Sequence, residues 1–183
     1  MVLVWIGAGA AVVILLYLII VYNRIVNLRN QVENSFAQID VQLRRRSDLI
    51  PNLVDTVKGY VKHERSVLEN VTKARTAFLN AKNTDEKVKA NNMLTDTLKS
   101  LFAVSENYPD LKANQNFLSL QEELSTTENK IAHARQYYND RVMEFNVYIQ
   151  SFPPNILAGI FGAQRKEMLE TPEAARENVR VSF

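Results

Sequence analysis

VLVWIGAGAAVVILLYLIIVY, residues 2–22, is a run of apolar and small residues without a single charged side chain. An α-helix rises 1.5 Å per residue, so about 20 such residues cross the roughly 30 Å hydrocarbon core of a bilayer. Trp5 lies near one end of the run and Tyr17 and Tyr22 near the other, where aromatic side chains favour the membrane–water interfaces. The stretch predicts a transmembrane helix over residues 1–23, with membrane lipid as its partner.

The flanks of this run argue against a cleaved signal peptide and give the helix a direction. No Lys or Arg precedes the run, and the bulky residues 21–23 offer no small-x-small cleavage site. Arg24 and Arg29 follow directly, and three more arginines occupy residues 44–46. The excess of basic residues on the cytoplasmic side of membrane proteins then predicts an inner-membrane protein with its N-terminus outside and its C-terminal domain in the cytoplasm.

Small residues cluster within the apolar run. Gly7 and Ala11 are four positions apart and therefore share one helix face. Such spacing lets transmembrane helices pack closely, which predicts self-association through Gly7 and Ala11. The alternative is that small residues are simply common in membrane helices.

Beyond residue 23, apolar residues recur every three or four positions, which is typical of a helix that faces a core. The first such stripe follows the apolar run without a break: Ile25, Leu28, Val32, Phe36, Ile39 and Leu43. The membrane helix is therefore expected to continue to about Arg46. Ser47 or Asp48 would cap a second helix, with Pro51 tolerated in its first turn.

Three more helices are expected. The second stripe extends from Leu53 to Phe78, and Asn83 or Thr84 can cap a third helix, which ends before the turn at Tyr108. The fourth, residues 117–149, has the near-heptad spacing of a coiled coil. The sequence thus predicts an all-α protein, a transmembrane helix continuous with an up-down antiparallel bundle of about four long helices over residues 24–152.

Residues 153–183 are expected to form a short amphipathic segment and a C-terminal tail. Pro153 and Pro154 stop the fourth helix, and one helical face can then be shared by Ile156, Leu157, Ile160 and Phe161. We expect this segment to pack on the open end of the bundle; the alternative is that it lies in the membrane interface. From Glu170 onward the sequence resembles a flexible tail.

Charged residues interrupt two of the stripes. Glu64 and Arg75 lie on the apolar side of the second helix, and Glu128 and Arg135 on that of the fourth. Buried charges are costly unless they are paired. We therefore predict a structural polar core in which acid–base pairs join these two helices and fix their register.

The sequence contains few of the residue patterns that catalytic or metal sites require. There is no cysteine, and the two histidines do not form the Glu-x-x-His pattern of di-iron bundles. His63 is next to Glu64 but on an adjacent face, and nucleotide-binding, metalloprotease and hydrolase motifs are absent. We predict no cofactor and no metal. The net charge of +2 predicts no nucleic-acid partner, and residues 44–46 are interpreted as a solvated helix end.

Longer motifs resemble the LemA family of bacterial membrane proteins over almost the whole chain. They are Tyr22-Asn23, IDVQLRRRSDLIPNLVDTVKGYVKHE at residues 39–64, VTKAR at residues 71–75, YPDLK at residues 108–112, Thr127-Glu128-Asn129 with Arg135, Tyr138-Asn139, Phe145-Asn146 and Phe152-Pro153. The resemblance implies a membrane helix, a long-helix bundle and no established enzymatic activity. It also implies kinship with magnetosome-membrane proteins and an association with membrane quality-control proteases. Asn139 joins the predicted polar core because it lies in one of these motifs.

The expected function is a non-enzymatic, membrane-anchored scaffold or interaction protein that forms a homo-oligomer. The alternative is a signalling or regulatory module, in which the continuous first helix transmits movement to a membrane protease or another membrane protein partner. An enzyme that uses Glu64 and Glu128 is a third hypothesis, which variants with glutamine at these positions would test.

Overall fold

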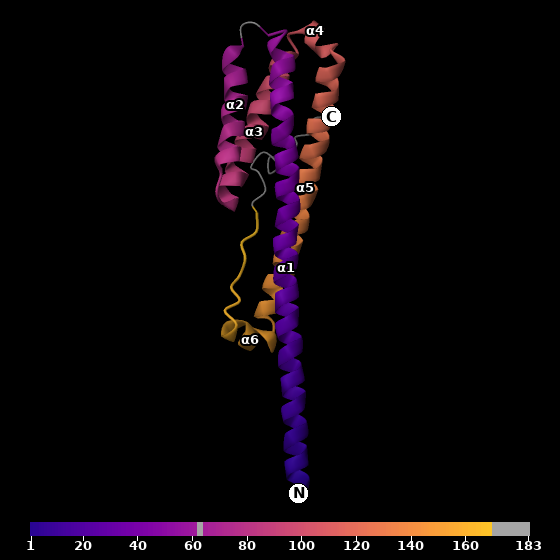
Figure 1. Cartoon of the computed structure of the whole chain (residues 1–183), viewed down its shortest axis with the longest axis vertical. Helices are drawn as coiled ribbons and strands as arrows, with labels where there is room; N and C mark the ends of the chain where they lie inside the picture. The colour runs from indigo at the N-terminus through magenta and orange to yellow at the C-terminus, as the bar shows by residue number, and fades with distance from the viewer. Residues whose placement is uncertain (62–63, 170–183) are drawn as a thin grey trace, which may run out of the picture. The chain divides into compact units, whose positions relative to one another are not determined.

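The computed structural model describes residues 1–61 and 64–169, with the side chains of residues 84 and 85 left out of the description. Its helices are α1 (Val2–Lys58), α2 (Arg65–Asn80), α3 (Thr84–Ser105), α4 (Pro109–Lys112), α5 (Gln115–Gln150) and α6 (Pro154–Ile160) (Figure 1). The described residues fall into two compact units: unit 1 holds residues 1–39 and 133–169, and unit 2 holds residues 40–132. Both α1 and α5 contribute one part to each unit.

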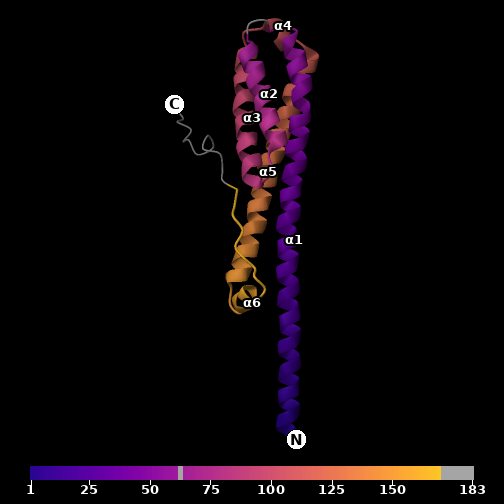
Figure 2. The same cartoon turned by 60° about the vertical axis from the view of Figure 1, so that its left-hand side comes forward.

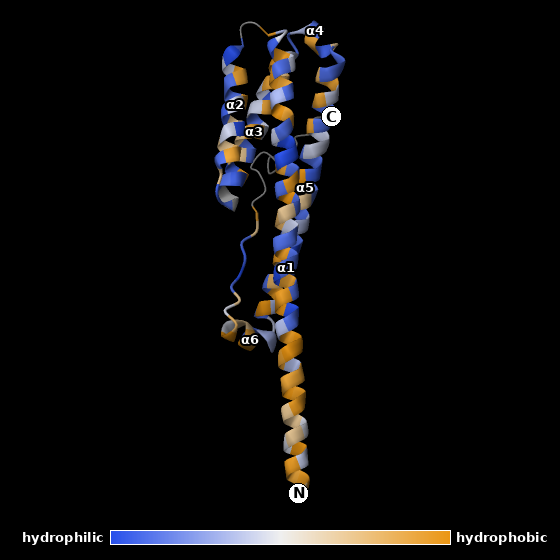
Figure 3. Ribbon diagram, viewed as in Figure 1, coloured by the Kyte–Doolittle hydropathy of each residue, from blue (hydrophilic) through white to orange (hydrophobic). Residues whose placement is uncertain are grey.

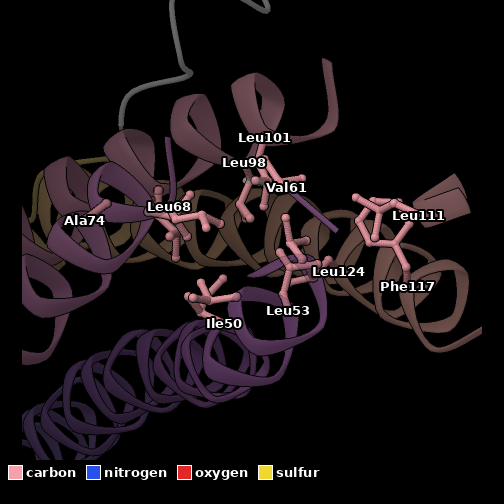
Figure 4. Close-up of a cluster of buried hydrophobic side chains, with 14 residues drawn as sticks. Ile50, Leu53, Val61, Leu68, Ala74, Leu98, Leu101, Leu111, Phe117 and Leu124 are labelled. Atoms are coloured by element: carbon pink, nitrogen blue, oxygen red, sulfur yellow. The ribbon is translucent and has the colours of Figure 1, made fainter. Parts of the chain in front are cut away.

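Unit 2 is a helical bundle formed by α2, α3, the second part of α1 and the first part of α5 (Figure 2). Apolar side chains from all four helices, with Leu111 of α4, meet in one buried cluster (Figure 4). Leu53, Val57 and Val71 are fully buried there. The stripes with helical spacing thus form the core that their pattern predicts.

The first helix ends later than expected. It passes through Pro51 and ends at Lys58, close to Gly59, whereas the sequence indicated an end near Arg46 and a new helix start around Ser47. A proline inside a helix leaves the carbonyl four residues earlier, here that of Ser47, without its N–H partner. The Arg75 Nε donates a hydrogen bond of 3.0 Å to this carbonyl oxygen. This contact removes part of the cost of Pro51, so the helix can continue.

The start of α3 confirms a capping prediction. The Asn83 side chain accepts a hydrogen bond of 2.8 Å from the Glu86 backbone N–H. Glu86 in turn accepts a hydrogen bond of 2.7 Å from the Lys82 backbone N–H through Oε2. The first of these bonds satisfies an N–H group that has no partner within the helix, and the second ties Lys82, just before the cap, to the first turn.

Unit 1 is formed by the first part of α1, the second part of α5, the short helix α6 and residues 163–169, which have no regular secondary structure. Val21, Ile25 and Leu28 of α1 and Val142 and Phe145 of α5 are among its buried side chains. A T-shaped contact joins the rings of Phe36 and Tyr138, with centroids 5.8 Å apart. The helix predicted after Pro153 is present as α6.

The predicted fold class is confirmed: the described chain is helical, its long helices pack as a bundle, and α1 begins with a long apolar segment. The division into residues 1–23, 24–152 and 153–183 stays a prediction. The tail predicted from Glu170 lies outside the described residues.

Candidate functional site

The first functional feature is the apolar segment of α1. All side chains from Met1 to Ile20 are exposed, and α1 is the one described helix that is long and apolar enough to be a candidate membrane span. Figure 3 shows this part of α1 mostly in the orange of apolar residues, with paler positions among them. A Cβ added at Gly7 or Gly9 would meet no atom within 4 Å, so the small-residue faces are open for packing.

The second feature is a buried cation in unit 2. The Arg46 side chain is only 4 % exposed, and its Nη1 donates hydrogen bonds to Asn91 Oδ1 at 3.1 Å and Thr95 Oγ1 at 2.9 Å, both on α3. The same Nη1 forms an ion pair with Glu128 on α5. Arg46 therefore connects α1 to two other helices of the bundle. Burial lowers the pKa of the Arg46 guanidinium, and the charge of Glu128 opposes this shift.

The buried position of Arg46 corrects an expectation. Residues 44–46 were interpreted as a solvated basic cluster, but only Arg44 and Arg45 are exposed. A signal was available, because Arg46 follows Leu43 by three positions and precedes Ile50 by four, which places it on the apolar stripe.

Unit 2 contains further ion pairs, formed by Asp40 and Arg45 of α1. Asp40 Oδ1 accepts a hydrogen bond of 2.5 Å from Lys87, and its Oδ2 accepts one of 3.0 Å from Arg44. Burial by itself raises the pKa of the Asp40 carboxyl, but the contacts with Lys87 and Arg44 outweigh burial and hold that pKa below its usual value. Arg45 pairs with Glu123 of α5 at 2.6 Å. The charges thus tie α1 to α3 and α5.

The predicted polar core is divided between the units. Glu64, Arg75 and Glu128 belong to unit 2, and Arg135 and Asn139 to unit 1. The pairing that we expected between α2 and α5 stays a prediction, but two of its residues contact α1: Arg75 donates to the Ser47 carbonyl, and Glu128 pairs with Arg46. The physical reason is that α1 presents the groups in greatest need of partners, a buried guanidinium and a carbonyl left open by proline. Glu64 is half-buried at the N-cap of α2 and makes no side-chain capping bond.

The third feature is a pair of asparagine clamps in unit 1. Asn139 Nδ2 donates to the Leu169 carbonyl at 3.0 Å, and Asn139 Oδ1 accepts from the Leu169 N–H at 2.8 Å. Asn146 makes the same two contacts with the backbone of Lys166, both at 2.9 Å. The clamps hold residues 163–169 along α5, in the opposite chain direction.

The spacing of the clamps follows from backbone geometry. Asn139 and Asn146 are seven helical residues apart, roughly 10 Å, which equals the reach of three extended residues from Lys166 to Leu169. Both contacts are made to backbone atoms, so they impose no side-chain requirement on the clamped segment. Asn146 was quoted within a motif but was not predicted as a functional residue.

Unit 1 contains further polar contacts between α1 and α5. Arg135 is half-buried on α5. Glu144 accepts hydrogen bonds from Arg24 at 2.9 Å and from Arg141 at 2.8 Å, which joins α1 to α5. Burial, and secondarily the charge of Glu167, raises the pKa of the Tyr138 hydroxyl.

Within the described part of the chain, no group of three or more acidic or histidine side chains is placed to hold a metal ion. His63, which we considered beside Glu64, lies outside the described residues. The predicted lack of a metal and of a cofactor stays a prediction. The observed contacts pair buried charges and give hydrogen-bond partners to backbone groups, and they thereby fix the positions of the helices.

Comparisons with known proteins identify relatives of this chain. The model of the LemA family matches residues 35–183. Protein LemA of Metamycoplasma hominis is 25% identical over 161 residues, which cover 87% of this chain and 74% of that protein. Magnetosome proteins MamQ 1 and MamQ 2 of Paramagnetospirillum magneticum are each 24% identical over 179 residues, which cover 84% of this chain and 66% of each relative.

Proposed function

This chain belongs to the LemA family, and on that premise we propose that it is a non-enzymatic scaffold, anchored in a membrane by α1 and associated with copies of itself. The observation that carries the proposal is the course of α1. An apolar segment with every side chain exposed continues without a break into the part of the helix that packs within the units. Apolar surface of this extent needs a bilayer or another apolar partner to cover it.

Self-association is proposed through the face of α1 that carries Gly7 and Ala11. Both positions are exposed, and the space around Gly7 is open. A second copy of the helix could approach this face closely, because small side chains allow short distances between helix axes. Contacts in the membrane would then link neighbouring bundles, which is what a scaffold requires.

The test compares Gly7→Leu with Gly9→Leu, the same substitution two positions further along and therefore on the opposite helix face. Mass photometry of the full chain in detergent, and energy transfer between labelled copies in liposomes, report the assembly. We expect the unaltered chain and Gly9→Leu to be oligomeric and Gly7→Leu to shift toward monomers. A monomeric unaltered chain would refute self-association, and equal oligomers from both variants would refute this interface.

The continuity of α1 also favours a second candidate, a regulatory module that acts on a membrane partner such as a protease. An unbroken helix from Val2 to Lys58 offers a mechanical link between the membrane segment and unit 2. Such coupling requires an element with two states. Because the chain has no cysteine, cysteines introduced one at a time along α1 can be crosslinked at rest and under membrane stress. A pattern that changes supports regulation, and identical patterns argue against it.

A further inference from the structure

Residues 151–164, SFPPNILAGIFGAQ, lie in a second stretch without a charged side chain, residues 145–164, in a chain of which 23% of the residues are charged. The stretch contains α6 and its flanks. Phe152, Ile156 and Ile160 are 79%, 59% and 71% exposed. Large apolar side chains that are exposed together mark a contact surface more often than isolated ones do.

The two faces of α6 have different environments. Pro154, Leu157 and Ala158 are buried within unit 1. Ile156 and Ile160, four positions apart, share the opposite face and point away from the packed one. The packing of α6 on unit 1 is therefore complete without them. We call the exposed group of Phe152, Ile156 and Ile160 the outer face of α6.

A ring contact fixes the level of α6 along α1. The ring of Phe161, directly after α6, makes a T-shaped contact with the ring of Tyr22, with centroids 5.0 Å apart. Tyr22 ends the apolar run, and twenty helical residues, roughly 30 Å, separate it from Val2. A bilayer that covers the apolar run of α1 would therefore have its surface close to Tyr22, and thus close to α6.

From this position we infer that the outer face of α6 inserts into the membrane interface, as a second membrane contact beside α1. The inference rests on the proposed function, because it requires that α1 spans the membrane. Interfacial helices bury an apolar face about 5–10 Å deep at the level of the headgroups. The outer face offers large apolar side chains for such insertion. Arg165, which is exposed just beyond the uncharged stretch, can pair with anionic headgroups. Unit 1, held at two points, would not rotate freely about the axis of α1.

The experiment uses spin labels on the full chain in liposomes that contain an anionic lipid. Single cysteines replace Ile156 and Ile160, and power saturation compares collisions with oxygen, which concentrates in lipid, and with a water-soluble nickel chelate. The matched control is Tyr137→Cys on α5 of the same unit, also an exposed apolar position, at 45%. Its neighbour Tyr138 contacts Phe36, fourteen residues or roughly 21 Å along α1 from Tyr22, beyond the reach of the interface.

We expect the oxygen-to-nickel collision ratio at positions 156 and 160 to exceed that at position 137 several-fold. Equal ratios at all three positions would overturn the inference. Labels that are immobile and shielded from both reagents would also overturn it, because they would show that another protein copy covers the face. A label at Ile14, within the apolar run, separates the two proposals. If Ile14 is in lipid while 156 and 160 are in water, only this inference fails; if Ile14 is in water, the anchor itself fails.

Discussion

At the scale of single residues, we expect the contributions of Pro51 and Arg75 to stability to be coupled. The Ser47 carbonyl lacks its helical partner because of Pro51, and Arg75 supplies a replacement at 3.0 Å. We predict that Arg75→Ala destabilises the native chain by about 1–3 kcal/mol, the usual cost of an unsatisfied buried polar group. In a Pro51→Ala background the new N–H of residue 51 can bond to Ser47, so the same substitution should cost much less. Thermal unfolding in detergent measures both differences.

Arg65→Ala is the matched control for this cycle. Arg65 lies on the same helix, but its side chain is 90% exposed and pairs with Glu69 within one turn. Exposed pairs of this kind contribute about 0.3–0.5 kcal/mol. The loss should be equal in both backgrounds. If Arg75→Ala costs the same with and without Pro51, the two residues are not coupled, and the passage of α1 through Pro51 needs another cause.

The carboxyl of Asp40 gives unit 2 a pH dependence of known sign. Its pKa is lower in the folded chain than in the unfolded one, because Lys87 and Arg44 outweigh the effect of burial. The contribution of Asp40 to stability is therefore fully present above the unfolded pKa, about 3.9, and is lost as the pH falls through the folded pKa. We expect the melting temperature to fall more steeply on acidification for the unaltered chain than for Asp40→Asn.

Asp55→Asn is the control for the acid titration, because the Asp55 side chain is 74% exposed and contacts only Lys58, at 3.5 Å, among the described residues. Its slope of melting temperature against pH should match that of the unaltered chain. Parallel slopes for all three proteins would show that the contacts of Asp40 add no acid-sensitive stability.

At the scale of elements, the asparagine clamps predict how firmly residues 163–169 are held. Asn146 makes two hydrogen bonds to Lys166. If each contributes about 1 kcal/mol, Asn146→Ala raises the fraction of released segment roughly 30-fold. Trypsin cleaves after Arg165 and Lys166, so mass spectrometry should detect faster cleavage there in Asn146→Ala. Asn155→Ala, at an exposed asparagine of α6, should cleave at the original rate.

Asn146→Asp refines this test, since a carboxylate still accepts from the Lys166 N–H but has no hydrogen to donate to its carbonyl. An intermediate cleavage rate would show that both bonds contribute. If neither variant is cleaved faster, the clamps do not limit the release of the segment.

The elements also show what the sequence can predict and where it stops. Apolar spacing located α5 and α6, and the cap at Asn83 located the start of α3, because these signals are local. Pro51 wrongly indicated a helix start, because the passage of α1 through it depends on a contact between Ser47 and Arg75, which are far apart in the chain. The partners of Arg75 and Glu128 were missed for the same reason. The clamps were missed because residues 163–169 have no periodicity that would indicate a bound segment.

At the scale of the whole molecule, the direction of the proposed membrane span of α1 decides which partners unit 2 can meet. Arg24 and Arg29 follow directly after the apolar run, so we predict that unit 2 is cytoplasmic. The chain has no cysteine, which makes single-cysteine labelling clean. In intact spheroplasts, an impermeant maleimide should label Val2→Cys but not Ser125→Cys, which lies on the exposed side of α5. After lysis it should label both.

A further experiment tests whether the basic residues Arg24 and Arg29 cause this topology. Lysines inserted directly after Met1 remove the asymmetry, so they should expose Ser125→Cys to the reagent in a fraction of the intact spheroplasts. If Ser125→Cys is labelled in the unaltered charge background, the bundle is outside and cytoplasmic partners are ruled out. If the topology is as predicted but the added lysines have no effect, the folded domain and the contact of α6 with the membrane, rather than Arg24 and Arg29, hold α1 in its orientation. In that case the orientation of the protein would be stabilised mainly by unit 1, where the rings of Tyr22 of α1 and Phe161, directly after α6, are in contact.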